Sequence, residues 1–151
     1  MKACFIGLGY IGLPTAIVAA DNGIEVIGVD VNPKVVETIN RGKIHIVEPG
    51  LADLAAKVVH NGGLRAQLEP EVSDTYLIVV PTPFTGDHEP DVSYVEAATR
   101  SVIPFLKECD LFIIESTRET PASALEKVAL ADLQEIAARV EKLGIQTNVA
   151  G

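Results

Sequence analysis

The sequence contains no tryptophan, and its few tyrosines and phenylalanines bring the aromatic share to only 5%. A platform on which nucleic-acid bases stack needs aromatic faces, so this scarcity argues against such a platform. Basic residues are also few, because 12 Lys and Arg stand against 21 Asp and Glu, for a net charge of −9. Such a surface repels phosphate backbones and anionic lipids, so we expect neither nucleic acid nor a membrane as a partner.

Cysteine and long apolar runs are scarce as well. Cys4 lies in an apolar run and Cys109 directly before another, and they form no C-x-x-C pair. This usage favours a reduced compartment over a disulfide framework. No run of 18 apolar residues occurs, and the N-terminus carries no signal-peptide pattern. These absences predict a soluble, cytoplasmic domain.

Histidine supplies no metal-binding pattern. His45, His60 and His88 lie far apart in the sequence, without the spacing of metal ligands. We therefore favour surface histidines over a metal site, and no metal is expected.

The chain does have the length and apolar content of one folded domain, with 151 residues, 48% of them hydrophobic and 22% charged. Short apolar runs alternate with longer stretches in which apolar residues recur every three or four positions. This alternation is typical of a parallel sheet covered by helices. We predict a single-domain α/β fold, a doubly wound parallel sheet of the Rossmann type with strand order 3-2-1-4-5.

The individual elements follow from apolar periodicity and from turn residues. Strands are predicted at residues 3–6, 25–30, 64–67, 76–80 and 111–114, with a possible sixth at 145–149. Helices are predicted at residues 10–22, 33–42, 51–61, from Asp91 to a break at Pro104, and from Thr120 to Gly144.

A glycine-rich turn directly follows the first predicted strand, where residues 7–12 read GLGYIG and fit the pattern GxGxxG. The pattern is weak alone, but here it lies between a strand and a helix. Gly7 permits a tight turn, Gly9 lets backbone amides approach a pyrophosphate, and Gly12 lets the helix lie close to the sheet. The helix N-terminus adds N–H donors and partial positive charge, so the segment predicts a dinucleotide-binding site.

Asp30 strengthens this interpretation. It lies 18 residues after Gly12, at the end of the second predicted strand. There its carboxylate can accept both hydrogen bonds from an adenosine ribose, while its charge repels a 2′-phosphate, which favours NAD over NADP. The competing interpretation is a glycine-rich turn that binds nothing, followed by a solvated aspartate.

Two threonines are further candidates for cofactor binding. Thr82 and Thr117 each follow a predicted strand, at the carboxyl edge where open α/β sheets bind ligands, although ordinary turn threonines are the alternative. Cys4 is expected in the core, and Cys109 has no activating neighbour in the sequence. We therefore assign no catalytic residue.

Taken together, the motifs resemble the N-terminal NAD-binding domain of the UDP-glucose/GDP-mannose dehydrogenase family. The matching segments are residues 7–14 (GLGYIGLP), 28–32 (GVDVN), 40–49 (NRGKIHIVEP), 80–84 (VPTPF), 86–91 (GDHEPD) and 115–117 (EST). The segments around His45 and His88 are more specific than the glycine turn and single out the N-acetylmannosamine branch of the family. The resemblance covers residues 1–117.

The resemblance implies both a cofactor and a reaction. In that family the residues that match Tyr10, Ile11, Asp30, Thr82 and Thr117 contact NAD. Members oxidise the C6 alcohol of a UDP-sugar twice, to a carboxylate, with two NAD, and the branch implies UDP-N-acetyl-D-mannosamine. The family's catalytic cysteine lies in a G-G-[HC]-C type motif that this sequence lacks. We expect the chain to bind NAD, and to bind a UDP-sugar only together with a missing second domain.

The sequence departs from the family pattern after Thr117. Residues 118–122 (RETPA) resemble instead an Arg-Glu-Ser-Pro-Ala stretch of the family's distant UDP-binding domain, where it also opens a helix. We therefore divide the chain into residues 1–117, the NAD-binding domain, and residues 118–151, a helix and possible last strand that complete the sheet. Either a deletion joined segments that lie far apart in the family's sequences, or the sequence of a truncated domain came to resemble the distant segment by chance. A contiguous natural reading frame through residues 112–130 would exclude the first hypothesis.

Three functional hypotheses remain at this point. The chain is the cofactor-binding part of a UDP-sugar dehydrogenase, a stand-alone NAD-binding or sensing module, or a structural Rossmann-like domain without a cofactor. Titration with NAD separates the third hypothesis from the other two.

Overall fold

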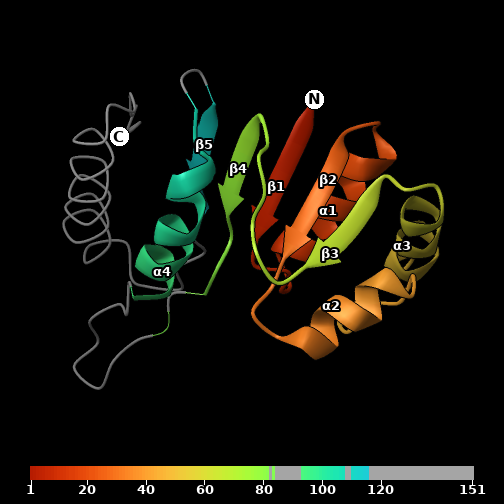
Figure 1. Cartoon of the computed structure of the whole chain (residues 1–151). Helices are drawn as coiled ribbons and strands as arrows, with labels where there is room; N and C mark the ends of the chain where they lie inside the picture. Colours follow the sequence, from red (N-terminus) through yellow and green to blue (C-terminus); the bar gives the residue numbers. More distant parts are fainter. Residues whose placement is uncertain (82, 84–92, 108–109, 116–151) are drawn as a thin grey trace, which may run out of the picture.

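The computed structural model describes residues 1–81, 83, 93–107 and 110–115 (Figure 1). Within these residues one sheet forms from strands β1 (Lys2–Ile6), β2 (Glu25–Val29), β3 (Leu64–Gln67), β4 (Thr75–Ile78) and β5 (Leu111–Ile114). All neighbouring strands are parallel, in the order β3-β2-β1-β4-β5. The predicted doubly wound fold and its strand order are confirmed.

The helices begin and end at residues that suit their termini. They are α1 (Gly12–Asp21), α2 (Pro33–Asn40), α3 (Leu51–His60) and α4 (Ser93–Val102). Asn32 caps α2 because its side chain accepts a hydrogen bond from the Lys34 N–H (3.0 Å), and Pro33 occupies the first helical position. After α4 the chain forms a single 3₁₀ turn, Ile103–Phe105, so Pro104 ends the regular helix as predicted.

Several predicted boundaries differ from the structure by one or two residues, and two of these differences have a clear physical reason. The fourth strand ends at Ile78 and not at residue 80. The Val79 N–H still donates to the Ile6 carbonyl (2.8 Å), but Val79 packs into the core beside the glycine turn. A run of apolar residues indicates that the segment is buried, but it does not by itself indicate that the segment pairs with a neighbouring strand. The first helix begins at Gly12, two residues after the predicted start, because the chain still turns there.

Several predictions fall on residues outside the described ranges. They are the Asp91 helix start, the helix from Thr120, the possible strand at residues 145–149, and the positions of Thr82, His88, Cys109 and Thr117.

Two separate core clusters lie one on each side of the sheet. Alternate residues of β1, β2 and β4 contribute to both, β3 contributes only to the first, and β5 only to the second. On the side that we call the α1 face, Ala3 and Phe5 of β1 pack with apolar residues of α1, α2 and α3. On the opposite side, the α4 face, Cys4 and Ile6 pack with the buried stripe of α4. None of the described helices is long and apolar enough to cross a membrane.

The end of α2 is fastened to β3 by one side chain. The amide of Asn40 donates to the Ala66 carbonyl (2.8 Å), and its oxygen accepts from the Ala66 N–H (2.8 Å). A pair of hydrogen bonds to the same residue fixes both the height and the direction of the helix end relative to the strand.

The connection from β3 to β4, residues 68–74, has no helix and crosses the α4 face in front of β2 and β1 (Figure 1). We call this segment the strap. One end of the strap is held by Tyr76, which is fully buried. Its hydroxyl accepts from the Ser73 N–H (2.9 Å) and donates to the Phe105 carbonyl (3.1 Å). Tyr76 thus connects the strap to the end of the α4 segment.

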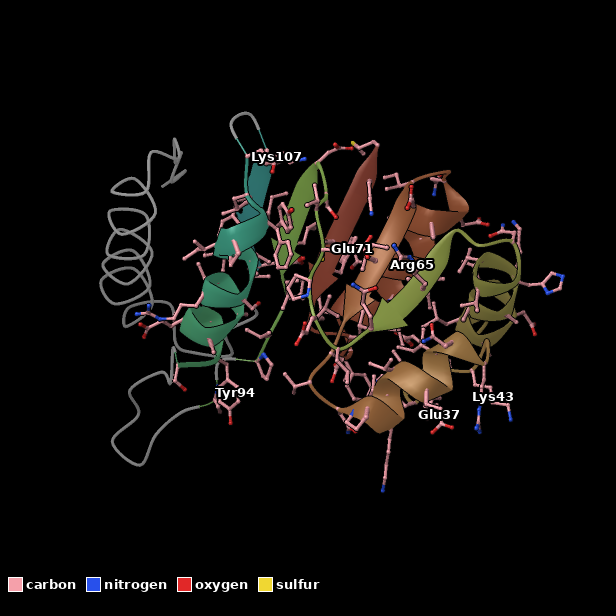
Figure 2. The ribbon with its side chains drawn as sticks, in the orientation of Figure 1. Glu37, Lys43, Arg65, Glu71, Tyr94 and Lys107 are labelled. Atoms are coloured by element: carbon pink, nitrogen blue, oxygen red, sulfur yellow. The ribbon has the colours of Figure 1, made fainter. Side chains whose placement is uncertain are left out.

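Glu71 holds the middle of the strap. Its carboxylate accepts hydrogen bonds from Lys2 on β1 and Arg65 on β3, and from the Gln67 amide (3.3 Å). Figure 2 shows Glu71 and Arg65 close together over the sheet. The Lys2 hydrogen bond, followed by the charge of Arg65, lowers the pKa of Glu71 although partial burial opposes this.

We predict that Glu71→Gln makes the unfolding free energy less dependent on pH. Because the folded pKa of Glu71 lies below its ordinary value, its carboxylate stabilises the fold at neutral pH, and this stabilisation is lost as the pH falls below about 4.5. At pH 7 we expect a loss of about 1–3 kcal/mol, which shrinks toward acid pH. Urea unfolding at constant ionic strength measures both quantities.

Glu69→Gln is the matched control for this prediction. It removes the same charge from an exposed residue of the strap whose side chain has no partner among the described residues. Equal effects of the two substitutions at every pH would contradict the role of Glu71.

Candidate functional site

The glycine turn between β1 and α1 packs against the residues at the ends of β2 and β4. The Gly7 N–H donates to the Val29 carbonyl (2.8 Å), which connects the turn to the end of β2. Gly7 has φ 101°, a left-handed conformation, and a Cβ there would overlap the Val79 carbonyl oxygen. Only glycine satisfies both conditions, so the predicted tight turn at Gly7 is confirmed.

Gly12 lies in a crowded part of this turn, whereas Gly9 lies in an open part. A Cβ on Gly12 would overlap the Gly7 carbonyl oxygen and would lie 3.4 Å from the Val79 Cβ, so the start of α1 touches the turn directly. A Cβ on Gly9 would meet no described atom within 4 Å. The turn therefore has free space at Gly9, where the sequence predicts the approach of a diphosphate.

The N-terminus of α1 offers unpaired donors beside this space. No side chain caps Ile11, and the first turn of the helix contains no acidic residue. The N–H groups of Tyr10, Ile11 and Gly12 have no backbone acceptor among the described residues. Free N–H groups at a helix start carry partial positive charge, so this end of α1 suits an anion such as a diphosphate.

Asp30, directly after β2, is fixed beside the turn. One carboxylate oxygen accepts from the Leu8 N–H (3.1 Å), and the other accepts from the Asn32 N–H (2.9 Å). The Asp30 N–H donates to the Gln67 carbonyl at the end of β3 (3.2 Å). A carboxylate accepts about four hydrogen bonds, so Asp30 keeps lone pairs for two ribose hydroxyls.

Sequence reasoning missed the role of Leu8. Its side chain is fully buried and lies over Gly28 of β2, where a Cβ would come within 2.8 Å of the Leu8 Cδ1. Together with the contact to Asp30, this packing fixes the middle of the turn. An apolar residue between the first two glycines was the available signal.

The structure brings Gly7, Gly9, Gly12 and Asp30 together at the carboxyl edge of the sheet. Tyr10 and Ile11 lie at the same edge and are exposed, Tyr10 by 70% of its surface. Thr82 and Thr117 lie outside the described residues. The structure describes the segment that leads to Thr117 as far as Glu115, whose N–H donates to the Ile78 carbonyl (2.9 Å).

The other candidate side chains are the thiol of Cys4 and two exposed histidines. Cys4 is buried in the sheet, and burial raises the pKa of its thiol to about 11, although a hydrogen bond from the Glu71 backbone opposes the rise. Such a thiol is protonated at neutral pH. His45 and His60 are exposed, and the described part of the chain contains no group of three His, Cys, Asp or Glu residues that could hold a metal.

A doubly wound parallel sheet, an open glycine turn at a helix N-terminus and an acid after the second strand define a dinucleotide-binding domain. The chain belongs to the UDP-glucose/GDP-mannose dehydrogenase family, whose NAD binding domain matches residues 1–150. NAD is therefore its cofactor.

Similar proteins include several sugar-nucleotide dehydrogenases. The UDP-N-acetyl-D-mannosamine dehydrogenase of Escherichia coli K12 is 51% identical over 146 residues, which cover 95% of this chain and 34% of that protein. The NDP-N-acetyl-D-galactosaminuronic acid dehydrogenase of Ralstonia nicotianae is 54% identical over 124 residues, which cover 82% of this chain and 29% of that protein. The solved structure of the UDP-D-ManNAc dehydrogenase of Pyrococcus horikoshii has a TM-score of 0.83 at 36% identity, and covers 99% of this chain and 34% of that chain. The chain thus spans about a third of the length of these relatives.

We predict that Gly9→Ala and Gly12→Ala separate cofactor binding from folding. Because the space at Gly9 is open, Gly9→Ala should change the unfolding free energy by no more than about 0.5 kcal/mol. The added methyl group blocks the diphosphate, so affinity for NAD should fall about tenfold or more. Calorimetric titration with NAD and urea unfolding measure the two effects.

Gly12→Ala serves as the contrast. Its Cβ would overlap backbone, so we expect a loss of stability of about 1–3 kcal/mol or more before any ligand is added. A stable Gly12→Ala domain, or a Gly9→Ala domain with undiminished affinity for NAD, would contradict the geometry of the turn.

Proposed function

We propose that the chain is the NAD-binding part of a UDP-sugar 6-dehydrogenase that converts UDP-N-acetyl-D-mannosamine to UDP-N-acetyl-D-mannosaminuronate. The observation that carries the cofactor role is the contact between Asp30 and the Leu8 N–H, which fixes a ribose-binding carboxylate beside an uncapped helix N-terminus. The names of two relatives that are 51% and 52% identical to this chain over the aligned residues support the sugar. The proposed setting is the cytoplasm.

In the proposed complex each group has a separate task. The N–H groups at the start of α1 hold the diphosphate, with Gly9 leaving room for it. Asp30 accepts hydrogen bonds from the adenosine ribose, and Tyr10 and Ile11 flank the cofactor. Thr82 and Thr117, each after a strand, complete the contact with NAD.

The chemical step needs more than these groups. NAD, when bound, supplies the hydride acceptor. Oxidation of an alcohol to an acid also needs a base and a nucleophile that traps the aldehyde. Cys4 cannot serve as that nucleophile, because its thiol is buried and protonated. The chain's own residues therefore bind and orient the cofactor, while the UDP-sugar pocket and the catalytic cysteine belong to the rest of a full-length enzyme.

An alternative function is a stand-alone NAD-binding or sensing module without catalysis. The observation that supports it is the cofactor turn itself, which is complete within the described residues. Binding of NAD supports both functions, and only turnover in the presence of a second domain separates them.

We also propose the domain division from the sequence, with residues 118–151 as a helix and possible last strand that complete the sheet. The family match runs through residue 150, across this boundary.

We predict that Asp30→Ala lowers the affinity for NAD about tenfold or more, because hydrogen bonds to a charged group contribute about 1.5–3 kcal/mol each. Asp30→Asn removes the charge and keeps one acceptor oxygen, so only one of the Leu8 and Asn32 N–H groups retains its acceptor. We expect a smaller loss of affinity for NAD than in Asp30→Ala, together with relaxed discrimination against NADP. Calorimetric titrations with both cofactors provide the measurement, with Asp53→Asn on the exposed side of α3 as the control. Unchanged NAD/NADP selectivity in both Asp30 variants would place the ribose elsewhere.

We further predict that this chain binds NAD without detectable dehydrogenase activity. The assay follows absorbance of NADH after addition of UDP-N-acetyl-D-mannosamine at high protein concentration. The full-length UDP-N-acetyl-D-mannosamine dehydrogenase of Escherichia coli is the positive control. Sustained production of NADH by the 151-residue chain would overturn the proposal and point to a nucleophile within it, with Cys109 the first to test.

A further inference from the structure

Two of the three apolar side chains of the strap are largely exposed, whereas the third, Pro70, is buried. Leu68 is 51% exposed and Val72 is 44% exposed, so neither side chain anchors the strap in the core. Segments that bury little apolar surface open at low free-energy cost, often without unfolding of the rest of the domain. Apart from the burial of Pro70, the attachment of the strap therefore comes from its polar contacts.

Both ends of the strap are tied to neighbouring strands. At one end the Gln67 amide donates to the Glu69 carbonyl (2.7 Å). At the other end the Asp74 N–H donates to the Lys2 carbonyl (2.9 Å), and the Asp74 carboxylate accepts from the Lys2 N–H (2.7 Å). These contacts define where the strap begins and ends. Its middle is held by the burial of Pro70, by the Tyr76 hydroxyl, which lies 3.3 Å from the Glu71 carbonyl oxygen, and by the Glu71 carboxylate.

Glu71 gathers donors from two strands that are not neighbours. Lys2 reaches it from β1, while Arg65 reaches it from β3, on the far side of β2 (Figure 2). The ammonium group of Lys2 also lies 3.9 Å from the carboxylate of Glu25, at the start of β2. A single carboxylate on the strap thus compensates two cations that stand on the α4 face of the sheet.

Directly beneath the middle of the strap lies the thiol of Cys4. Arg65, Ile27 and Cys4 stand in register on adjacent strands, so they form one row across the α4 face. Cys4 and Ile27 are both fully buried. A hydrogen bond between the Glu71 backbone and Cys4 places the strap against the sulfur.

We propose that the strap is a latch, which opens as a unit while the sheet stays folded, and that the Glu71 carboxylate holds it closed. Opening breaks the contacts of Glu71 with Lys2 and Arg65 and uncovers the row that contains Cys4. The thiol then reacts with reagents that the closed latch excludes.

The rate at which Cys4 reacts with iodoacetamide measures opening of the latch. The whole 151-residue chain is used with Cys109→Ser, which leaves Cys4 as its only thiol. In this background Glu71→Gln should react about tenfold faster or more, because a neutral amide loses its attraction to both cations. Glu69→Gln, which removes a charge from the same strap without breaking a described contact, should react at the original rate. Equal acceleration by the two substitutions would overturn the proposal.

Urea separates local opening from global unfolding. Opening of the strap exposes little surface, so the logarithm of the labelling rate should depend on urea much less steeply than the global unfolding equilibrium does. Identical urea dependence would mean that Cys4 reacts only in the unfolded chain, and it would overturn the latch.

A second variant keeps the test decisive if Glu71→Gln does not fold. Arg65→Gln removes one of the two cations and leaves Glu71 paired with Lys2. It should accelerate labelling less than Glu71→Gln, and in the folded state it should keep the weak urea dependence. A rate no faster than that of the parent would overturn the assignment of Glu71 as the group that holds the strap.

Discussion

The glycine turn after β1 is pressed against the ends of β2 and β4, and the geometry of the cofactor site depends on that contact. Gly7 lies between the Val29 and Val79 carbonyls, and Gly12 touches Gly7 from the helix side. With no side chain at either position, α1 starts at the edge of the sheet and its free N–H groups lie beside Gly9. Asp30 then reaches the Leu8 N–H from the neighbouring strand. The anion-binding end of the helix and the ribose-binding acid are thus positioned by one close approach of backbones.

The two faces of the sheet are covered in different ways. The α1 face is covered by helices whose apolar stripes bury a continuous cluster. On the α4 face, α4 covers part of the sheet, and the strap covers β1 and β2 with charged and polar groups converging on Glu71. Apolar burial resists opening in proportion to the area buried, whereas a charge cluster depends on one group remaining ionised. The α4 face therefore combines an apolar cluster beneath α4 with a charged cluster beneath the strap, whereas the α1 face is covered by apolar helix stripes alone.

The sequence predicted the parts of the site that depend on local patterns. Four features are each encoded within a few residues, and the structure contains all of them. They are the glycine turn, the acid at the end of the second strand, the Asn32 cap and the break at Pro104. The contacts that complete the site could not be predicted from the sequence. The hydrogen bond between Leu8 and Asp30 joins residues that follow two different strands, and Lys2 at the start of β1 meets Glu71 on the connection from β3 to β4. Such pairs are set by strand order and by the path of a connection, neither of which leaves a periodic signal. The end of β4 was missed for a related reason, since Val79 is apolar because it packs beside the glycine turn and not because it continues the strand.

The two hydrogen bonds between Asn40 and Ala66 have a consequence for the solubility of the domain. Within the described sheet β3 lies at the edge, where an unpaired row of N–H and C=O groups offers a template for another chain. The Asn40 amide occupies both backbone groups of Ala66 in the way that a residue of an additional strand would. A strand from a second molecule could not pair at this residue without displacing Asn40 and the end of α2. One side chain therefore protects the middle of β3 from edge-to-edge aggregation.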